Sequence, residues 1–245
     1  MIRKTLLFLL VASTICLAAC KVEPDLPDDP HVPLVNPFIG VWKTGAEYWR
    51  FNPNGTGGKA STQSGPFPDS FSFLYFNGKG NHGHAAPSLV ILEDSNGEVS
   101  VTRYTYSSAT VQWATLTPAT GESPVMLERV SGSPQVISLT NSLIGEWLAD
   151  WTGSHNTGSS TWSLKYYTDG TVKMYHHGMG DHQFENAYAL RGNTLVIFGT
   201  LRFMIAPIIG EINQQGNGKW HVQERQTNPV PVEWTYTKVA TAEWL

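Results

Sequence analysis

A seven-residue phrase occurs twice in this chain of 245 residues. Residues 36–42 read Asn-Pro-Phe-Ile-Gly-Val-Trp, and residues 141–147 read Asn-Ser-Leu-Ile-Gly-Glu-Trp. Asn, Ile, Gly and Trp recur at the same positions, and the two phrases lie about one small domain apart. Because an internal repeat at this spacing is the signature of duplicated structure, the chain is predicted to contain two copies of one fold. The repeat constrains the architecture and leaves the substrate or ligand open.

Two further matches follow the opening phrase in the same order. An aromatic residue and a polar turn precede Gly-Thr at residues 51–56 and again at 166–171. Residues 78–82 read Gly-Lys-Gly-Asn-His, and residues 178–182 read Gly-Met-Gly-Asp-His. Any single match could arise by chance in a Gly-rich chain, so their common order is the stronger argument for duplication.

Short apolar–polar alternations, broken by Gly, Asn, Asp and Pro roughly every ten residues, predict antiparallel β-sheet. The expected strands lie near 41–46, 47–52, 56–62, 70–77, 86–93, 98–106, 109–117 and 124–130 in the first copy, and near 146–152, 161–168, 170–177, 183–191, 194–199, 201–209, 217–226 and 231–239 in the second. Eight short strands per copy fit a closed up-and-down barrel, which leaves no free sheet edge. Such a barrel is either filled by side chains or holds one small ligand.

These motifs resemble those of the lipocalin family. Gly-x-Trp at 40–42 and 145–147 is similar to the family's first-strand motif, and aromatic-x-x-(Asn/Asp)-Gly-Thr is similar to a phrase of small bacterial lipocalin-like domains. The resemblance covers most of residues 36–239, although each copy is shorter than a typical secreted lipocalin. We expect an all-β protein of two tandem antiparallel eight-stranded lipocalin-like barrels. The alternative is one large barrel or sandwich built from both copies.

The resemblance also implies a role for a basic residue near the end of each last strand. In the family, the first-strand Trp plugs the closed end of the barrel and the basic side chain packs across it. Carried over, Trp42 pairs with Arg129 and Trp147 pairs with Lys238. Strand parity separately places both basic residues on the apolar side of their strands. A cation over a Trp ring gains roughly 1–2 kcal/mol when it is partly desolvated, and snorkelling of the long stem to the barrel rim is the alternative.

The start of the chain carries a targeting signal. Arg3 and Lys4 precede an apolar run at 6–17, which is too short to span a bilayer, and Leu-Ala-Ala-Cys follows at 17–20. This order resembles a bacterial lipoprotein signal peptide with its lipobox. The resemblance implies cleavage before Cys20 and acyl chains, palmitate among them, on Cys20. The alternative is an ordinary secretory signal with a chance Cys at its end.

A lipid-modified Cys20 predicts a membrane partner. Several acyl chains on one residue anchor firmly, because each buried methylene contributes roughly 0.8 kcal/mol. The expected localisation is the cell envelope, and Lys21 after the Cys favours the outer membrane. Whether the protein faces the periplasm or the cell surface is left open.

Composition divides the chain into segments. Residues 21–35 hold four prolines and four acidic residues, which favour an extended spacer over a packed core. The expected segments are a cleaved signal peptide at 1–19, a lipidated Cys and flexible tether at 20–35, barrel 1 at 36–131, a linker at 132–136 and barrel 2 at 137–245.

Several classes of chemistry lack support in the sequence. Cys16 falls in the discarded segment, so the mature chain keeps only Cys20 and has no disulfide or Cys-based metal site. Removal of Arg3 and Lys4 takes the net charge from −4 to about −6, and no basic run occurs, so nucleic acid is not an expected partner. His176 and His177 point to opposite faces of a strand and cannot chelate together. No catalytic motif is present, so we expect no enzyme, no cofactor and no metal.

The expected function is non-enzymatic binding of a small hydrophobic ligand inside a barrel, at the open end opposite the Trp plug. The strand face with Phe71 and Phe73 is either barrel core or the wall of such a pocket. The alternative is a surface module with filled barrels that binds a protein, or a glycan through exposed rings of Trp49, Trp113 or Trp151.

Overall fold

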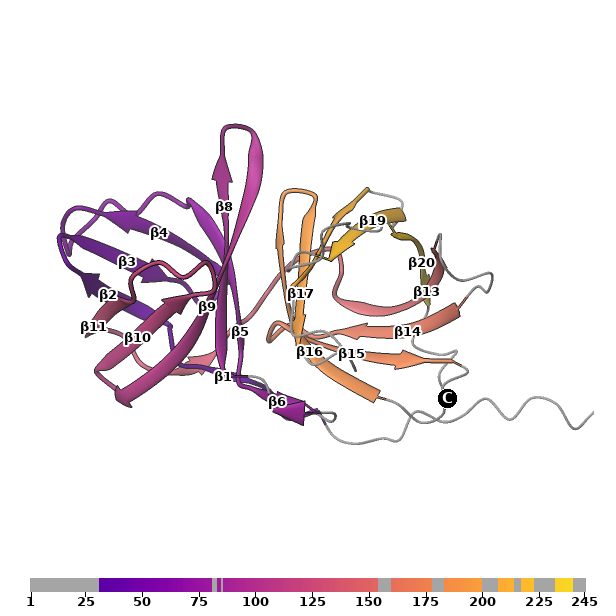
Figure 1. The fold of residues 1–245 in the computed structure, drawn as a ribbon, viewed down its shortest axis with the longest axis horizontal. Helices are drawn as coiled ribbons and strands as arrows, with labels where there is room; N and C mark the ends of the chain where they lie inside the picture. The colour runs from indigo at the N-terminus through magenta and orange to yellow at the C-terminus, as the bar shows by residue number, and fades with distance from the viewer. Residues whose placement is uncertain are drawn as a thin grey trace, which may run out of the picture. The chain divides into compact units, whose positions relative to one another are not determined.

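The computed structural model describes residues 31–80, 83–84, 86–153, 160–177, 183–199, 207–213, 217–222 and 232–239. The expected signal peptide, Cys20 and the tether up to residue 30 lie outside these residues. Every helix or strand within the described residues is a β-strand, and most strands belong to two closed eight-stranded antiparallel barrels (Figure 1).

Both barrels have simple up-and-down order. Barrel 1 consists of β2 (Gly40–Thr44), β3 (Glu47–Phe51), β4 (Thr56–Ala60), β5 (Phe71–Phe76), β8 (Ser88–Ser95), β9 (Glu98–Thr110), β10 (Trp113–Pro118) and β11 (Val125–Ser131). Barrel 2 consists of β13 (Gly145–Gly153), β14 (Ser160–Tyr166), β15 (Thr171–His176), β16 (Gln183–Arg191), β17 (Thr194–Gly199), β18 (Ile208–Ile212), β19 (Asn217–Val222) and β20 (Val232–Val239). Two short ladders join β1 (Val35–Asn36) to β12 (Gln135–Val136) and β6 (Lys79–Gly80) to β7 (Gly83–His84).

Closure of the strand ladders decides between the two expected folds. Arg129 of β11 is the ladder partner of Trp42 in β2, and Lys238 of β20 is the ladder partner of Trp147 in β13. Each copy therefore closes on itself. The prediction of two tandem antiparallel eight-stranded barrels is confirmed, and one large barrel or sandwich is excluded.

Aromatic side chains fill the interior of barrel 1. Phe38 has 0% exposure, and its ring centroid lies 4.9–6.0 Å from those of four other rings: Trp42, Phe51, Tyr75 and Tyr106. Phe51 makes edge contacts with Phe71 and Phe73 at 5.4 and 5.0 Å, a favoured aromatic geometry. Burial, with a smaller effect of Tyr106, raises the pKa of Tyr75 to about 12. The strand face with Phe71 and Phe73 is therefore barrel core.

The repeated Asn starts the same turn in both copies. The Asn36 Oδ1 accepts a hydrogen bond of 2.9 Å from the backbone N–H of Phe38, and the Asn141 Oδ1 accepts one of 3.0 Å from Leu143. A side-chain oxygen that bonds to the backbone two residues on fixes a tight turn. The turn carries the side chain of Phe38 or Leu143 into the apolar core.

The repeated Gly and Trp complete this turn. The indole Nε1 of Trp42 donates to the carbonyl oxygen of residue 38 at 2.6 Å, and that of Trp147 donates to residue 143 at 2.7 Å. Gly40 has φ +127° and Gly145 has φ +123°, a region that L side chains rarely adopt. A Cβ on Gly40 would also collide with the backbone of Ser131. The repeat is therefore a structural motif that caps each barrel.

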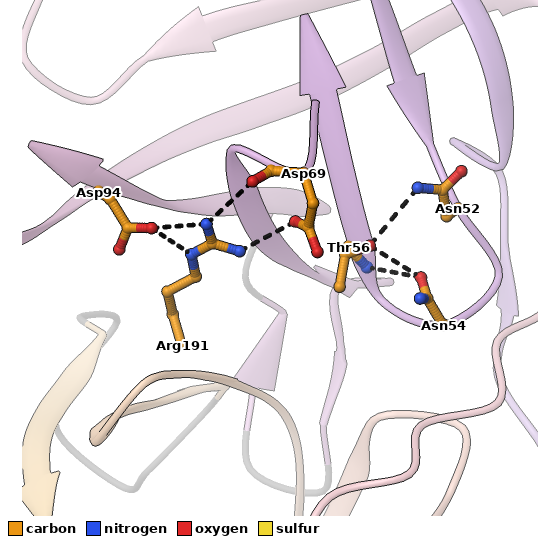
Figure 2. Close-up of polar contacts among 6 residues, drawn as sticks. All are labelled: Asn52, Asn54, Thr56, Asp69, Asp94 and Arg191. Carbon is orange, nitrogen blue, oxygen red and sulfur yellow. Dashed lines mark hydrogen bonds and ion pairs between the residues drawn. The ribbon is translucent and has the colours of Figure 1, made fainter. Parts of the chain in front are cut away.

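The second repeated motif forms equivalent turns. The Asn54 Oδ1 accepts hydrogen bonds from the N–H and hydroxyl of Thr56 at 3.1 and 3.0 Å (Figure 2). The Asp169 Oδ1 accepts the same two bonds from Thr171 at 3.1 and 2.7 Å. The second carboxylate oxygen of Asp169 also accepts a hydrogen bond of 2.7 Å from the backbone N–H of Leu34. An Asn at this position has only one side-chain oxygen and could not supply both acceptors.

A segment between the barrels bonds to both of these turns. The backbone N–H of Ser138 donates to the carbonyl of Pro53 at 2.6 Å, and that of Leu139 donates to the carbonyl of Thr168 at 2.7 Å. Pro53 and Thr168 occupy the same position in the two repeats. The linking chain therefore meets the two copies through matching groups.

The third sequence match is wrong. Residues 78–80 follow β5, the fourth strand of barrel 1, whereas residues 178–182 fall between β15 and β16, the third and fourth strands of barrel 2. The two segments connect different pairs of strands, and 81–82 and 178–182 lie outside the described residues. The Gly-x-Gly-polar-His similarity thus arose without structural equivalence.

The two barrels pack through equivalent strands. An apolar cluster joins the fourth and fifth strands of each barrel, and its buried members are Leu74, Phe76, Val90, Leu92, Ala187, Ala189, Val196 and Phe198. The rings of Phe76 and Phe198 meet edge-on at 5.5 Å, and the Arg103 guanidinium lies 4.7 Å from the Phe198 ring centroid. Packing of the same surface on two copies is the arrangement of an isologous dimer.

An arginine joins the barrels beside this cluster. The Arg191 guanidinium of barrel 2 lies 3.0 Å from the Asp69 carboxylate and 2.6 Å from the Asp94 carboxylate of barrel 1 (Figure 2). Its Nε also donates to Asp94 at 3.0 Å, and its Nη2 donates to the backbone carbonyl of Asp69 at 3.3 Å. The hydrogen bonds that Arg191 donates to Asp94, and to a lesser degree to Asp69, raise the pKa of Arg191.

Replacing Arg191 with alanine should lower the free energy of unfolding by about 1–2 kcal/mol, because a side chain that is only 15% exposed loses several charge-assisted hydrogen bonds. The control is Lys219→Ala, which removes a 3.0 Å ion pair between side chains 69% and 63% exposed and should cost less than about 0.5 kcal/mol. Urea denaturation of the full chain measures both losses. Equal losses would show that Arg191 contributes no more than a surface pair.

Candidate functional site

The sequence-predicted pair in barrel 1 lies together and is tightly held. The Arg129 guanidinium lies 4.1 Å from the Trp42 ring centroid. It donates hydrogen bonds to three backbone carbonyls, those of Ile39 at 2.8 Å, Val111 at 2.9 Å and Pro37. Burial lowers the pKa of this half-buried guanidinium. These bonds join the capping turn to the β9–β10 turn and seal this end of barrel 1.

The equivalent pair in barrel 2 is looser. The Lys238 Nζ lies 5.4 Å from the Trp147 ring centroid, and the Lys238 side chain is exposed. Trp147 is half-buried, whereas Trp42 is 2% exposed. The residue at the centre of the cap also differs, since Leu143 stands where barrel 1 has an aromatic ring. The structure thus brings both predicted pairs together, with a less complete seal in barrel 2.

An earlier end to the ladder between the last two strands adds to this difference. In barrel 1 the ladder between β10 and β11 reaches Glu128, the residue before Arg129. In barrel 2 the ladder between β19 and β20 ends at Thr235, which pairs with Asn217, three residues before Lys238. The last residues of β20 therefore lie beyond the β19–β20 ladder and pair with β13 alone among the described strands.

A pocket of about 430 Å³ lies beside this end of the β19–β20 ladder. Its lining consists of Asn193, Glu211, Ile212, Asn213, Asn217, Gly218, Lys219, Glu233, Trp234 and Thr235. Ile212, Gly218 and Trp234 are successive partners across the ladder, so Gly218 leaves a row of inward positions without its middle side chain. The missing side chain at Gly218 explains why space remains here. We name this space the hairpin pocket.

Trp234 connects the hairpin pocket to an aromatic group inside barrel 2. Its ring lies 5.9 Å from Trp162, which in turn lies 4.6 Å from His176 and 6.1 Å from Phe184. Trp162, His176 and Trp234 are half-buried. Barrel 2 thus offers partly accessible aromatic surface next to the pocket.

The interior of barrel 2 also carries an amide. Asn186 is 2% exposed, and its Nδ2 lies 3.2 Å from the Met174 sulfur. The opposing residue is Gly199, and a Cβ there would collide with the Asn186 side chain. Within the described residues, the buried Asn186 Oδ1 has no hydrogen-bond partner. A buried amide of this kind makes the interior of barrel 2 more polar than an all-hydrocarbon core.

A serine and a histidine that no sequence motif links lie within hydrogen-bond distance in barrel 2. The Ser163 Oγ lies 2.6 Å from the His177 Nε2, a distance that also suits a nucleophile and its base. Ser163 is only 3% exposed and lies within β14, so its hydroxyl is out of reach of a substrate. Burial lowers the pKa of His177 and favours the neutral ring. We interpret the pair as a structural hydrogen bond.

The other histidines do not form a site in the described part of the chain. His176 contacts Trp162 on the inner face, and His177 contacts Tyr175 at 5.0 Å on the outer face, as strand parity predicts. No three His, Cys, Asp or Glu side chains group as metal ligands among the described residues. His82, His155 and His182 lie outside those residues.

The tryptophans expected to face a glycan are differently placed. Trp49 is 7% exposed and packs 6.4 Å from Phe51 in the core of barrel 1. Trp113 is 42% exposed on β10. Trp49 is therefore unavailable as a surface binding residue, whereas Trp113 is available.

In the chain segments that the structure describes, no helix is both long and apolar enough to cross a membrane.

The hairpin pocket lies at the capped end of barrel 2, whereas the sequence predicts a site at the open end. The nearest signal is the change from Arg129 to Lys238 at the end of the last strand, together with Gly218 in an otherwise strand-forming segment. A lysine cannot reproduce the guanidinium fork, and a strand glycine marks a place without side-chain packing. Neither signal shows where the ladder between the last two strands ends, so the position of the pocket could be seen only in the structure.

Matched substitutions test the difference between the two caps. Arg129→Met should lower the free energy of unfolding by about 2–4 kcal/mol, because three carbonyls at a half-buried site lose a charged donor. Lys238→Met should cost less than about 1 kcal/mol, because it removes an exposed cation–ring contact. Urea denaturation compares the variants, and equal losses would contradict a tighter seal in barrel 1.

Comparison with known proteins found no family model, no curated protein and no solved structure that matches this chain. The proposal for its function therefore rests on the residues and geometry described above.

Proposed function

We propose that this protein is a lipid-anchored, non-enzymatic protein of the bacterial cell envelope that binds a small molecule through barrel 2. Acyl chains on Cys20 hold it at the membrane, and Lys21 directly after the lipidated Cys favours the outer membrane. The tether carries the barrels away from the lipid surface. The observation that carries the binding proposal is the hairpin pocket, which lies where the equivalent end of barrel 1 is sealed.

The contrast between the copies supports a division of roles. The cap of barrel 1 is sealed by Arg129, which bonds to three backbone carbonyls, so barrel 1 suits a scaffold. Barrel 2 combines a pocket of about 430 Å³, within the usual size range of ligand sites, with half-buried Trp162 and Trp234. Ile212 and Trp234 give the pocket an apolar part, and its other side chains are polar or charged. The pocket favours a partly apolar ligand.

A second candidate function follows from the outer surface of barrel 1. Trp113 and Met126 are 42% and 57% exposed on the adjacent strands β10 and β11, and Val111 is 73% exposed in the β9–β10 turn. Exposed apolar side chains that gather on neighbouring elements are typical of protein-binding surfaces. This surface favours a protein partner as the alternative to a small ligand.

Binding of the neutral fluorescent amine N-phenyl-1-naphthylamine tests the small-molecule proposal. The probe should gain fluorescence with the full mature chain, and Trp234→Leu should weaken its affinity by about tenfold or more, because the ring borders the pocket. Trp113→Leu is the matched control, since it removes a Trp from the outside of barrel 1. Far-UV circular dichroism verifies that both variants fold.

Equal loss of affinity in the two variants, or loss in Trp113→Leu alone, would move the binding site to the outer surface of barrel 1 and contradict the proposal.

The anchor has its own test. Cys20→Ser should abolish incorporation of labelled palmitate and release the protein from the membrane fraction, because the thiol that carries the lipid is gone. Cys16→Ser, which changes a residue in the cleaved segment, should leave both unchanged. Palmitate labelling of Cys20→Ser at the level of the parent chain would refute lipidation at this residue.

A further inference from the structure

We propose that the hairpin pocket binds a neutral saccharide of one or two rings, an inference that rests on the proposed ligand-binding role of barrel 2. The sequence predicts an apolar ligand, whereas the lining of the pocket carries far more polar groups than such a ligand needs. The lining instead pairs amides and carboxylates with an indole and an aliphatic side chain.

The polar groups suit a ligand covered with hydroxyls. Asn193, Asn213 and Asn217 come from two turns at the end of barrel 2 and line the pocket. A carboxamide both donates and accepts hydrogen bonds, as does a hydroxyl, so the two groups are matched. The turn is braced, since the Asn213 Oδ1 accepts the backbone N–H of Asn217 at 3.0 Å and the Asn213 N–H donates to the carbonyl of residue 217 at 2.9 Å.

The apolar groups suit the face of a sugar ring. Ile212 and Trp234 belong to the apolar core cluster of the barrel, and they flank the buried Gly218. A pyranose presents C–H groups on its face and hydroxyls at its edge. It can therefore place its face toward the indole and its edge toward the amides. A fatty acyl chain would displace water from the exposed Asn193 and Asn217 carboxamides without offering a hydrogen bond in return, which costs free energy.

The charge of the pocket favours a neutral ligand over an anion. Lys219 is paired with Glu233 at 3.0 Å, so the lining retains the charge of Glu211 alone. A carboxylate ligand such as a fatty acid would be repelled by Glu211 and would find the one lysine already paired. The volume of about 430 Å³ suits a ligand of one or two rings.

Isothermal titration of the full mature chain with a panel of neutral mono- and disaccharides, and separately with sodium laurate, tests the inference. At least one saccharide should bind, and Asn217→Leu should weaken it by about tenfold, because one amide of the pocket is lost. Gln112→Met is the matched control, since it removes an exposed amide from the equivalent turn of barrel 1. This control should bind like the parent chain.

The possible results distinguish saccharide binding from the broader proposal that barrel 2 binds a ligand. Binding of laurate or the naphthylamine probe in a Trp234-dependent manner, with no saccharide bound, would overturn the saccharide and leave ligand binding by barrel 2 in place. No binding of any of these compounds would overturn both. Saccharide binding that Asn217→Leu leaves unchanged would overturn the assignment to the hairpin pocket.

Discussion

The pairing of first and last strands is the constraint on which the rest of this structure depends. In each barrel a Trp stands directly opposite a basic residue across that ladder, Trp42 opposite Arg129 and Trp147 opposite Lys238. A slip of one residue would turn every side chain of a strand to the other face. The register therefore fixes which residues enter the core, where the capping turn lies and how completely the barrel end is sealed. The two barrels share this register but differ at the capped end, where Arg129 bonds to backbone carbonyls in barrel 1 and Lys238 is exposed in barrel 2.

Much of the architecture could be predicted because the repeated residues act locally. Asn36 and Asn141 bond two residues along the chain, and Asn54 and Asp169 do the same. Alternating apolar residues between such turns predict several strands closely; those expected near 183–191 and 194–199 are observed as β16 at Gln183–Arg191 and β17 at Thr194–Gly199. The strand expected near 201–209 is displaced, since β18 is observed at Ile208–Ile212 and residues 200–206 lie outside the described part of the chain. Such signals depend on neighbours in the sequence, so one sequence is enough to recognise them.

The candidate site could not be predicted because it depends on distant segments. Where the β18–β19 hairpin ends relative to Lys238 is a matter of register between strands, and the sequence around Gly218 does not encode it visibly. The contacts of Arg191 with Asp69 and Asp94 join residues about a hundred positions apart. The match of residues 78–82 to 178–182 was wrong because the two similar sequences lie in loops that connect different pairs of strands.

The segment that joins the barrels has a consequence for folding. Ser138 and Leu139 bond to equivalent turns of both copies, and Ile137 and Leu139 belong to one apolar cluster with the cores of both barrels. Together with the buried cluster between the barrels, this arrangement means that neither barrel can lose its structure without exposing apolar surface of the other. The two copies are therefore expected to act as one cooperative folding unit, and any substitution that loosens one barrel lowers the stability of its duplicate.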